Sequence, residues 1–247
     1  MMCRPAPYNK GGVACPQKLE AGVRMTEDTK DRVLDAALVH VPFDGWSDRT
    51  LKAALADAGV AAGLGKALFP RGGVDLALAY HACGDAEMLA TLAETDLAAL
   101  RFRDRIAKAV QIRLQLADQE LVRRGSTLFS LPQHAGDGAK AVWGTADKIW
   151  TALGDTSTDV NWYTKRATLS AVYGATVLYW LGDTSPGHQA TWEFLDRRID
   201  GVMQFEKLKA AVRENPLGKA ILAGPGKVLE TLRAPRSPDN LPGRTKG

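Results

Sequence analysis

Apolar residues recur every three or four positions along most of this chain, and this spacing predicts helices joined by short polar turns. No segment shows the sustained alternation of apolar and polar residues that is typical of strands. The chain is therefore expected to be all-α, with about ten helices. Their predicted ranges are 26–41, 48–58, 61–68, 74–92, 94–116, 118–130, 139–153, 159–181, 187–208 and 216–233.

Local signals set several of these helix ends. Thr26 is a suitable N-cap for the first helix, and Pro42 is expected to end that helix because proline has no backbone donor. Ser47 is a suitable N-cap for the second helix, which Gly59 closes.

The first 25 residues contain several prolines and glycines and no periodicity, which predicts a disordered leader or an over-extended start. A transit peptide is the weaker alternative, because the segment has no serine and no amphipathic run. Four further parts are predicted: a small helical module, a larger helical domain for ligand binding and dimerisation, an amphipathic helix and a disordered tail. Their ranges are 26–70, 71–208, 215–234 and 235–247.

The first three helices have the spacing of a helix-turn-helix and resemble the N-terminal module of the TetR repressors. In that reading the third helix would enter the DNA groove and would need basic or amide side chains there. The segment 61–67 offers one cation, Lys66, which supplies little phosphate neutralisation. A degenerate module with no nucleic-acid partner is therefore the expectation.

Composition describes an ordinary globular chain of 247 residues, 45% hydrophobic and 24% charged. No window has the roughly 18 consecutive apolar residues of a membrane span. The three cysteines form no Cys-x-x-Cys pair, which favours a reducing compartment. Residues 206–247 carry nine basic and four acidic groups, a net +5 on a chain of net +4. This basic tail favours contact with an anionic surface.

Arrangements typical of catalytic or metal sites are absent from the pattern. The histidines at 40, 81, 134 and 188 are scattered, and no Glu-x-x-His pair exists. The segments 63–66 and 224–227 contain Gly-x-Gly-Lys without the spacing of a phosphate loop. No catalytic residue, metal ligand or cofactor is therefore predicted.

The polar segment 155–161 leads directly into a helix that is almost entirely apolar after Arg166. Trp162 and Tyr163 stand at the start of this helix beside a Lys-Arg pair, which indicates a surface for contact with a partner.

Four further residues form apolar stripes on neighbouring helices: Trp143 and Trp150, seven residues apart, and Leu169 and Tyr173 on the next helix. Such stripes occur both in filled cores and in the walls of apolar pockets, and the pattern does not separate the two.

The segment 216–233 forms a basic amphipathic helix after Asn215-Pro216, as expected either for a membrane interface or for docking on its own domain. Gly224-Pro225-Gly226 is expected to kink or split it. The predicted membrane-binding residues are Leu217, Lys219, Ile221, Lys227, Val228 and Leu232.

Several of these segments together resemble a known family, the ubiquinone-biosynthesis accessory proteins counted ninth in the eukaryotic coenzyme Q set. The resemblance is dense over 139–205 and weaker over 26–138. It rests on Trp143-Gly-Thr-Ala-Asp-Lys-Ile-Trp150, Asp159-Val-Asn-Trp-Tyr-Thr-Lys-Arg166, Tyr179-Trp-Leu181 and Phe194-Leu-Asp-Arg-Arg-Ile199.

The resemblance implies a TetR-like all-α fold without DNA binding and a homodimer formed through the late helices. It implies a non-enzymatic protein that needs no cofactor, holds an isoprenoid or other lipid, and presents the polyprenyl intermediate to the di-iron demethoxyubiquinone hydroxylase. The hydroxylase-binding surface maps onto Asp159, Trp162, Tyr163 and Arg166, and a membrane-binding helix onto 216–233.

It further implies peripheral association with the inner membrane, from the cytoplasm in a bacterium or from the matrix in a mitochondrion. The alternative that remains is a ligand-responsive regulator of TetR type.

Overall fold

The computed structural model describes residues 17–214, and this part of the chain folds into nine α-helices and one short 3₁₀ helix with no strand. The predicted all-α class is confirmed for this part. The elements are α1 Gln17–Asp44, α2 Asp48–Asp57, α3 Ala62–Leu68, α4 Gly73–Glu94, α5 Phe102–Gln115, α6 Gln119–Phe129, α7 Ala135–Ala152, α8 Val160–Gly182, η1 Pro186–His188 and α9 Gln189–Glu214.

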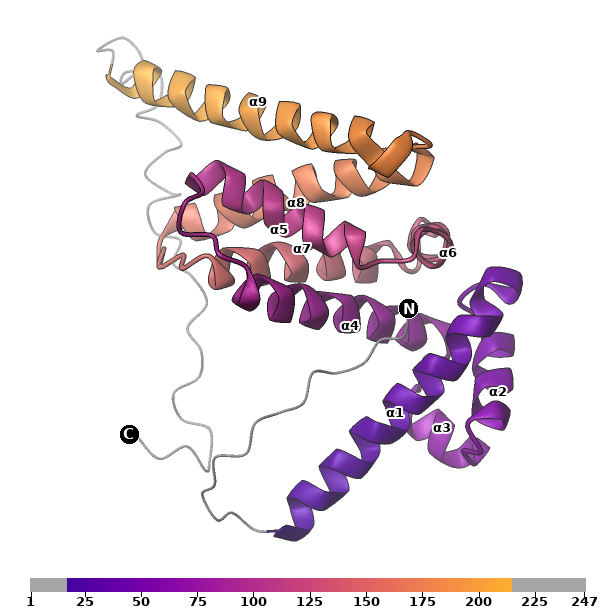
Figure 1. Ribbon diagram of the computed structural model, residues 1–247. Helices are drawn as coiled ribbons and strands as arrows, with labels where there is room; N and C mark the ends of the chain where they lie inside the picture. The colour runs from indigo at the N-terminus through magenta and orange to yellow at the C-terminus, as the bar shows by residue number, and fades with distance from the viewer. Residues whose placement is uncertain (1–16, 215–247) are drawn as a thin grey trace.

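The helices divide into a small module and a larger bundle (Figure 1). In the module, α1 packs along α2, α3 lies against α2, and α4 leads from the module into the bundle. In the bundle, α7 packs against α4 and α8, while α9 lies across α8 and α5. The last helices therefore form one outer side of the molecule.

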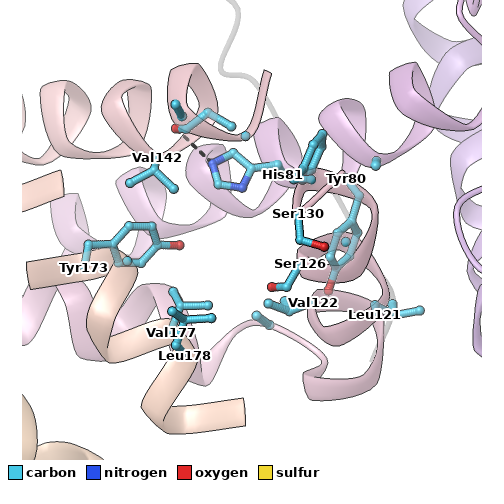
Figure 2. A pocket seen from close by; sticks show the side chains of 18 of the residues that line it. Tyr80, His81, Leu121, Val122, Ser126, Ser130, Val142, Tyr173, Val177 and Leu178 are labelled. Atoms are coloured by element: carbon cyan, nitrogen blue, oxygen red, sulfur yellow. Dashed lines mark hydrogen bonds between the residues drawn. The ribbon is translucent and has the colours of Figure 1, made fainter. Parts of the chain in front are cut away.

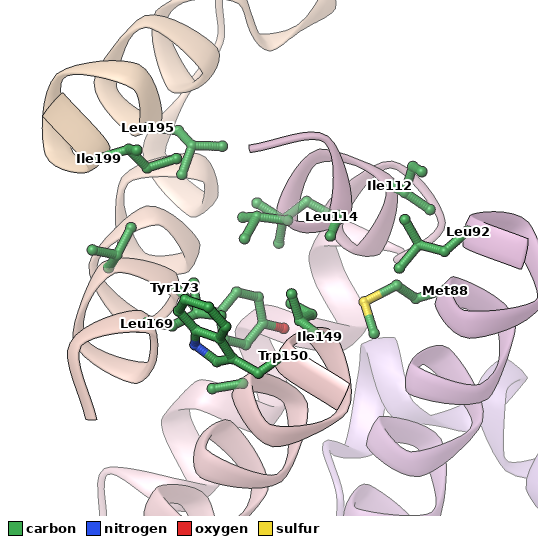
Figure 3. Close-up of a cluster of buried hydrophobic side chains, with 14 of the residues drawn as sticks. Met88, Leu92, Ile112, Leu114, Ile149, Trp150, Leu169, Tyr173, Leu195 and Ile199 are labelled. Atoms are coloured by element: carbon green, nitrogen blue, oxygen red, sulfur yellow. The ribbon is translucent and has the colours of Figure 1, made fainter. Parts of the chain in front are cut away.

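Each part has its own hydrophobic core. The core of the module centres on Val33, Val41, Trp46 and Leu76, all at most 5% exposed. The bundle core draws side chains from five helices (Figure 3): Met88, Leu92, Ile112, Leu114, Ile149, Trp150, Leu169, Tyr173, Leu195 and Ile199. Helix α4 contributes to both cores, which ties the two parts together.

Capping residues begin several helices, and Ser47 does so at the position predicted from the sequence. The Ser47 hydroxyl accepts a hydrogen bond from the Thr50 backbone N–H at 3.2 Å at the start of α2. Asp118 accepts from the backbone N–H groups of Glu120 and Leu121 at the start of α6. These side chains satisfy donors that the first helical turn leaves without partners.

Helix α1 differs from the prediction at both ends. It begins at Gln17, inside the segment expected to be a leader, and it continues through Pro42 to Asp44. Proline removes one helical hydrogen bond but not the following turn. The Gly45 backbone N–H still donates to the Val41 carbonyl at 2.8 Å, and Arg124 donates to the Pro42 carbonyl at 2.7 Å. Pro42 therefore does not end the helix, and the expectation that it would was wrong.

The helix predicted at 94–116 begins only at Phe102. Residues 95–101 form a turn instead, in which the Asp96 carboxylate accepts from the Ala98 backbone N–H at 2.9 Å. Arg105 holds this turn by donating to the Leu100 carbonyl at 2.9 Å. Such local hydrogen bonds compete with helical ones, and periodicity alone does not reveal them.

Candidate functional site

Three aromatic side chains gather where α7 meets the start of α8. Trp162 and Tyr163 contact edge to face, with ring centroids 4.8 Å apart, and Trp143 of α7 lies 6.0 Å from Trp162. All three are half-buried, so part of each ring faces solvent. We call Trp143, Trp162 and Tyr163 the aromatic surface. Asp159, which is exposed, caps α8 beside it by accepting from the Asn161 backbone N–H at 3.0 Å.

Arg166 supports the aromatic surface from beneath. Its side chain is 3% exposed, and its guanidinium lies 4.1 Å from the centroid of the Trp162 ring. The guanidinium donates to Asp147, to Asp155 at 2.9 Å and to the Trp162 carbonyl at 3.1 Å. A cation over an indole face, fixed by two carboxylates, holds the ring in place. Arg166 therefore positions the aromatic surface from within the fold.

Asp155 is the buried anion of this arrangement, with a side chain 2% exposed. Burial alone would raise the pKa of its carboxyl, but hydrogen bonds from Lys165, Ser157 and Arg166 outweigh that effect and hold the pKa well below its usual range. The Asp155 carboxylate thus joins the loop after α7 to the first turns of α8.

Trp150 and Leu169 lie in the bundle core, at 9% and 4% exposure. The Trp150 indole N–H donates to the Lys165 carbonyl at 3.1 Å, and its ring packs near Phe102 with centroids 5.5 Å apart. This packing holds α5, α7 and α8 together behind the aromatic surface.

A pocket of about 320 Å³ opens between α4, α6, α7 and α8 (Figure 2). Its walls are mostly apolar, and several rings line it, including those of Trp46, Tyr80, Phe129 and Tyr173. Val122, Val142, Val177 and Leu178 add aliphatic surface. The volume lies near the lower end of the range of small-molecule sites.

One wall of the pocket is polar, because His81 and Arg113 reach it from a buried network centred on Asp85. Asp85 is 1% exposed and accepts from Arg113 at 2.9 Å, Thr145 at 2.9 Å and Lys148 at 2.8 Å. Burial raises the pKa of Asp85, but His81, Arg113 and Lys148 lower it further than burial raises it. Asp85 is therefore an ionised carboxylate held by charged and hydroxyl donors.

Comparison with known proteins identifies the family. The family model described as COQ9 matches residues 135–206, which contain α7, α8 and the aromatic surface. The chain is 31% identical over 219 residues to ubiquinone biosynthesis protein COQ9-A, mitochondrial, of Xenopus laevis, a match covering 81% of the chain and 68% of that protein. The chain belongs to the COQ9 family.

Two further relatives in this family are the mitochondrial ubiquinone biosynthesis proteins COQ9 of Drosophila melanogaster and Homo sapiens. Each is 30% identical, over 205 and 210 residues, covering 81% and 80% of the chain. The chain spans 63% and 64% of the length of these two proteins.

The fold of this COQ9 family member is TetR-like. A crystal structure of a TetR transcriptional regulator from Nitrosomonas europaea superposes with a TM-score of 0.55, covering 70% of the chain and 97% of the regulator at 20% identity. This likeness confirms the predicted fold. Helix α3, in the position of a recognition helix, contains one basic residue, Lys66.

The predicted lipid-pocket residues separate in the structure. Tyr173 lines the pocket, whereas Trp143 belongs to the aromatic surface and Trp150 and Leu169 to the core. The predicted partner-binding residues do come together, with Asp159, Trp162 and Tyr163 at the surface and Arg166 beneath them. The predicted membrane-binding residues, Leu217, Lys219, Ile221, Lys227, Val228 and Leu232, lie outside the described residues.

Sequence reasoning missed His81, Asp85, Arg113 and the pocket-lining residues of α6. The available signal was the i, i+4 spacing of His81 and Asp85 within the predicted helix 74–92. Within residues 17–214, no group of three or more His, Cys, Asp and Glu side chains could hold a metal ion. No helix in this range is long and apolar enough to cross a membrane.

Proposed function

We propose that this COQ9 family member is a non-enzymatic lipid-binding accessory protein of ubiquinone biosynthesis. In this role it binds a polyprenyl quinone intermediate at the membrane and presents it to the di-iron demethoxyubiquinone hydroxylase. The observation that carries the proposal is the apolar pocket between α4, α6, α7 and α8. The relatives named as ubiquinone biosynthesis proteins supply the pathway.

The pocket suits one part of a prenylated molecule. Removing apolar surface from water contributes about 25 cal/mol per Å², so apolar walls can replace the lipid that surrounds the intermediate in a bilayer. At about 320 Å³ the pocket has room for a ring or a few isoprene units, while a long tail would extend beyond it. A protein that presents its ligand needs such partial enclosure.

The aromatic surface suits a partner protein. Tryptophan and tyrosine dominate binding hot spots, where rigid rings exclude water from the contact. Trp162 and Tyr163 are held by Arg166 and by α8, so little conformational entropy is lost when a partner covers them. In this proposal the reaction belongs to the hydroxylase that docks there.

The proposal also includes a membrane and a second copy of the chain. The basic segment 216–233 would bind the inner membrane, on the matrix side in a mitochondrion or the cytoplasmic side in a bacterium. Two neighbouring side chains of α8, Leu178 at 68% and Tyr179 at 40% exposure, offer apolar surface for a homodimer of the late helices.

Organic extraction of the purified full chain, followed by mass spectrometry, tests the proposal against the alternative of a TetR-type regulator. We expect a prenyl lipid in the extract and no specific DNA retention at physiological salt. Specific DNA retention together with a lipid-free extract would refute the accessory role and favour the regulator. We expect no DNA retention because α3 carries a single basic residue, Lys66, which neutralises little of the phosphate charge.

A further inference from the structure

The polar wall of the pocket contains a histidine whose hydrogen-bonding state follows from its neighbours. The Nε2 atom of His81 lies 2.8 Å from the Thr145 hydroxyl and 3.2 Å from the Ala141 carbonyl oxygen. A carbonyl oxygen can only accept. The Thr145 hydroxyl has a single proton, for which the Asp85 carboxylate at 2.9 Å and the Ala141 carbonyl at 3.3 Å are the acceptors. Both neighbours of Nε2 are therefore acceptors.

This arrangement selects one tautomer of His81. A proton on Nε2 gives both acceptors a donor, and no polar atom is left opposed. The other tautomer would direct the Nε2 lone pair at the Ala141 carbonyl and, at 3.8 Å, at an Asp85 oxygen. The Nε2–H tautomer is thus the one that the network stabilises, which makes Nδ1 an acceptor.

Burial also favours the neutral form of His81. Burial lowers the pKa of its imidazole, and although Asp85 opposes this shift, Arg113 and Lys148 reinforce it. Figure 2 shows the second ring nitrogen on the side of His81 that faces the open space of the pocket. The polar wall therefore presents a hydrogen-bond acceptor to any ligand inside.

The pocket also contains hydroxyl groups, those of Tyr80, Ser126, Ser130 and Tyr173, which can donate as well as accept. Arg113 uses its Nε for Asp85 and its Nη2 for the His81 carbonyl, at 2.9 and 3.1 Å. The Asp85 carboxylate is shared by Arg113 and Lys148, at 2.9 and 2.8 Å, so this network keeps one positive charge. The rings of Trp46, Tyr80 and Phe129 around the pocket suit an aromatic ligand.

We propose that the pocket binds the ring of a prenylated phenol, with the phenolic hydroxyl donating a hydrogen bond to His81 Nδ1. For the quinone intermediate of the proposed function, the site then favours the reduced, hydroquinone form over the oxidised quinone form, and likewise a free phenol over its aryl ether. A quinone oxygen or an ether oxygen only accepts, so either would oppose its lone pair to that of Nδ1 and leave a buried acceptor without a donor. This inference rests on the proposed function and names the ligand class for its pocket.

The test compares two ligands that differ only in the donor. Delipidated full chain is titrated calorimetrically with 2-geranylphenol and with its methyl ether. We expect the phenol to bind about two- to twelvefold more tightly, as one hydrogen bond contributes roughly 0.5–1.5 kcal/mol. Equal affinities would overturn the selection by His81. Binding of neither ligand would overturn the proposed lipid-binding role itself, and this inference with it.

Two variants and one spectrum complete the test. His81→Phe should bind both ligands with the affinity of the ether, whereas His40→Phe, altered at a histidine of α1 that pairs with Asp57, should keep the wild-type preference. Because His81→Phe could also disturb folding, ¹⁵N NMR of wild-type histidine provides an independent reading. We expect an unprotonated Nδ1 that shifts with the phenol and not with the ether. A protonated Nδ1 in the free protein would refute the proposal.

Discussion

The Arg166 guanidinium contacts two carboxylates, which tie the start of α8 to α7 and to the loop after it, and also the carbonyl and indole face of Trp162 within α8. Because Arg166 is buried, contact with a partner and positioning of the contact residues fall to different side chains. In the proposed function Trp162 and Tyr163 contact the partner, whereas Arg166 fixes the position of the Trp162 ring. Substitutions at these residues should therefore fail in different ways.

Arg166→Ala should lower the free energy of unfolding by about 3–5 kcal/mol, because it removes one partner from a buried ion pair. Urea denaturation followed by circular dichroism measures the change. Arg101→Ala, which removes a largely exposed cation paired with Asp104, should change stability little. A similar small effect at Arg166 would contradict the role given to its network.

Trp162→Ala should leave the fold intact and weaken hydroxylase binding by about tenfold or more, since truncated hot-spot aromatics carry such losses. Surface plasmon resonance with the purified hydroxylase measures the affinity. Phe43→Ala is the matched control, because Phe43 is an aromatic 83% exposed on α1, away from the aromatic surface. Equal affinities of wild type and Trp162→Ala for the hydroxylase would contradict the proposal that Trp162 contacts it.

At the scale of helices, close contacts decide which glycines can be replaced. A Cβ at Gly84 of α4 would lie 2.7 Å from Arg113 Nη1, whereas a Cβ at Gly144 of α7 would meet nothing within 4 Å. The absence of a side chain at Gly84 thus makes space for the Arg113 guanidinium, which pairs with Asp85 between α4 and α5.

Gly84→Ala should destabilise the protein by about 1–3 kcal/mol through this overlap. Gly144→Ala should stabilise it by about 0.5–1 kcal/mol, because alanine loses less backbone entropy in a helix interior. Thermal unfolding of both variants measures whether each substitution lowers or raises the stability. Stabilisation by both substitutions would show that Arg113 moves aside freely.

Asp183 joins the end of α8 to the start of α9. Hydrogen bonds from Thr191 and Ser185 hold the pKa of its carboxyl well below the usual range. A carboxyl whose folded pKa is depressed stabilises the fold above its unfolded pKa of about 3.9, and this contribution is lost as the pH falls below that value.

Asp183→Asn should therefore lower the urea midpoint at pH 7, and its difference from wild type should narrow as the pH falls from about 5 to 3. Denaturation curves across that interval test the sign. A difference that widens with acid would exclude Asp183 as an ionised link between α8 and α9.

For the molecule as a whole, the proposed functional surfaces lie on one bundle, and Leu178 belongs both to the pocket wall and to the proposed dimer contact. Helix α8 takes part in three of them: its first turn in the aromatic surface, its middle in the pocket, and Leu178 and Tyr179 in the proposed dimer contact. A ligand in the pocket and a partner on the aromatic surface would therefore contact the same helix, which suits the presentation of one to the other.

Removal of residues 215–247 should reduce binding to liposomes, most strongly to those with anionic lipid, because the removed segment carries six basic and two acidic residues. Co-sedimentation of the full and shortened chains measures this. Equal sedimentation of the two forms would refute the membrane role, while retained prenyl lipid in the shortened chain would show that the pocket acts without it.

Much of this fold follows from the sequence alone. The 3.6-residue spacing of apolar positions and the cap at Ser47 place most helices, because these signals act between neighbouring residues. Trp162 and Tyr163 at the start of α8 can be recognised in the sequence for the same reason. The turn at 95–101 and the passage of α1 through Pro42 were not, since Arg105 and Arg124 stabilise them through contacts that periodicity does not report.

Only the tertiary structure decided which side chains meet. It brought Trp143 to Trp162, left Trp150 and Leu169 in the core, and joined His81, Arg113 and Thr145 from three helices around Asp85. The physical reason is that an apolar stripe fixes which face of a helix is buried, not what packs against it. A core and a pocket wall therefore have the same pattern in sequence, and the packing of α4, α6, α7 and α8 separates them.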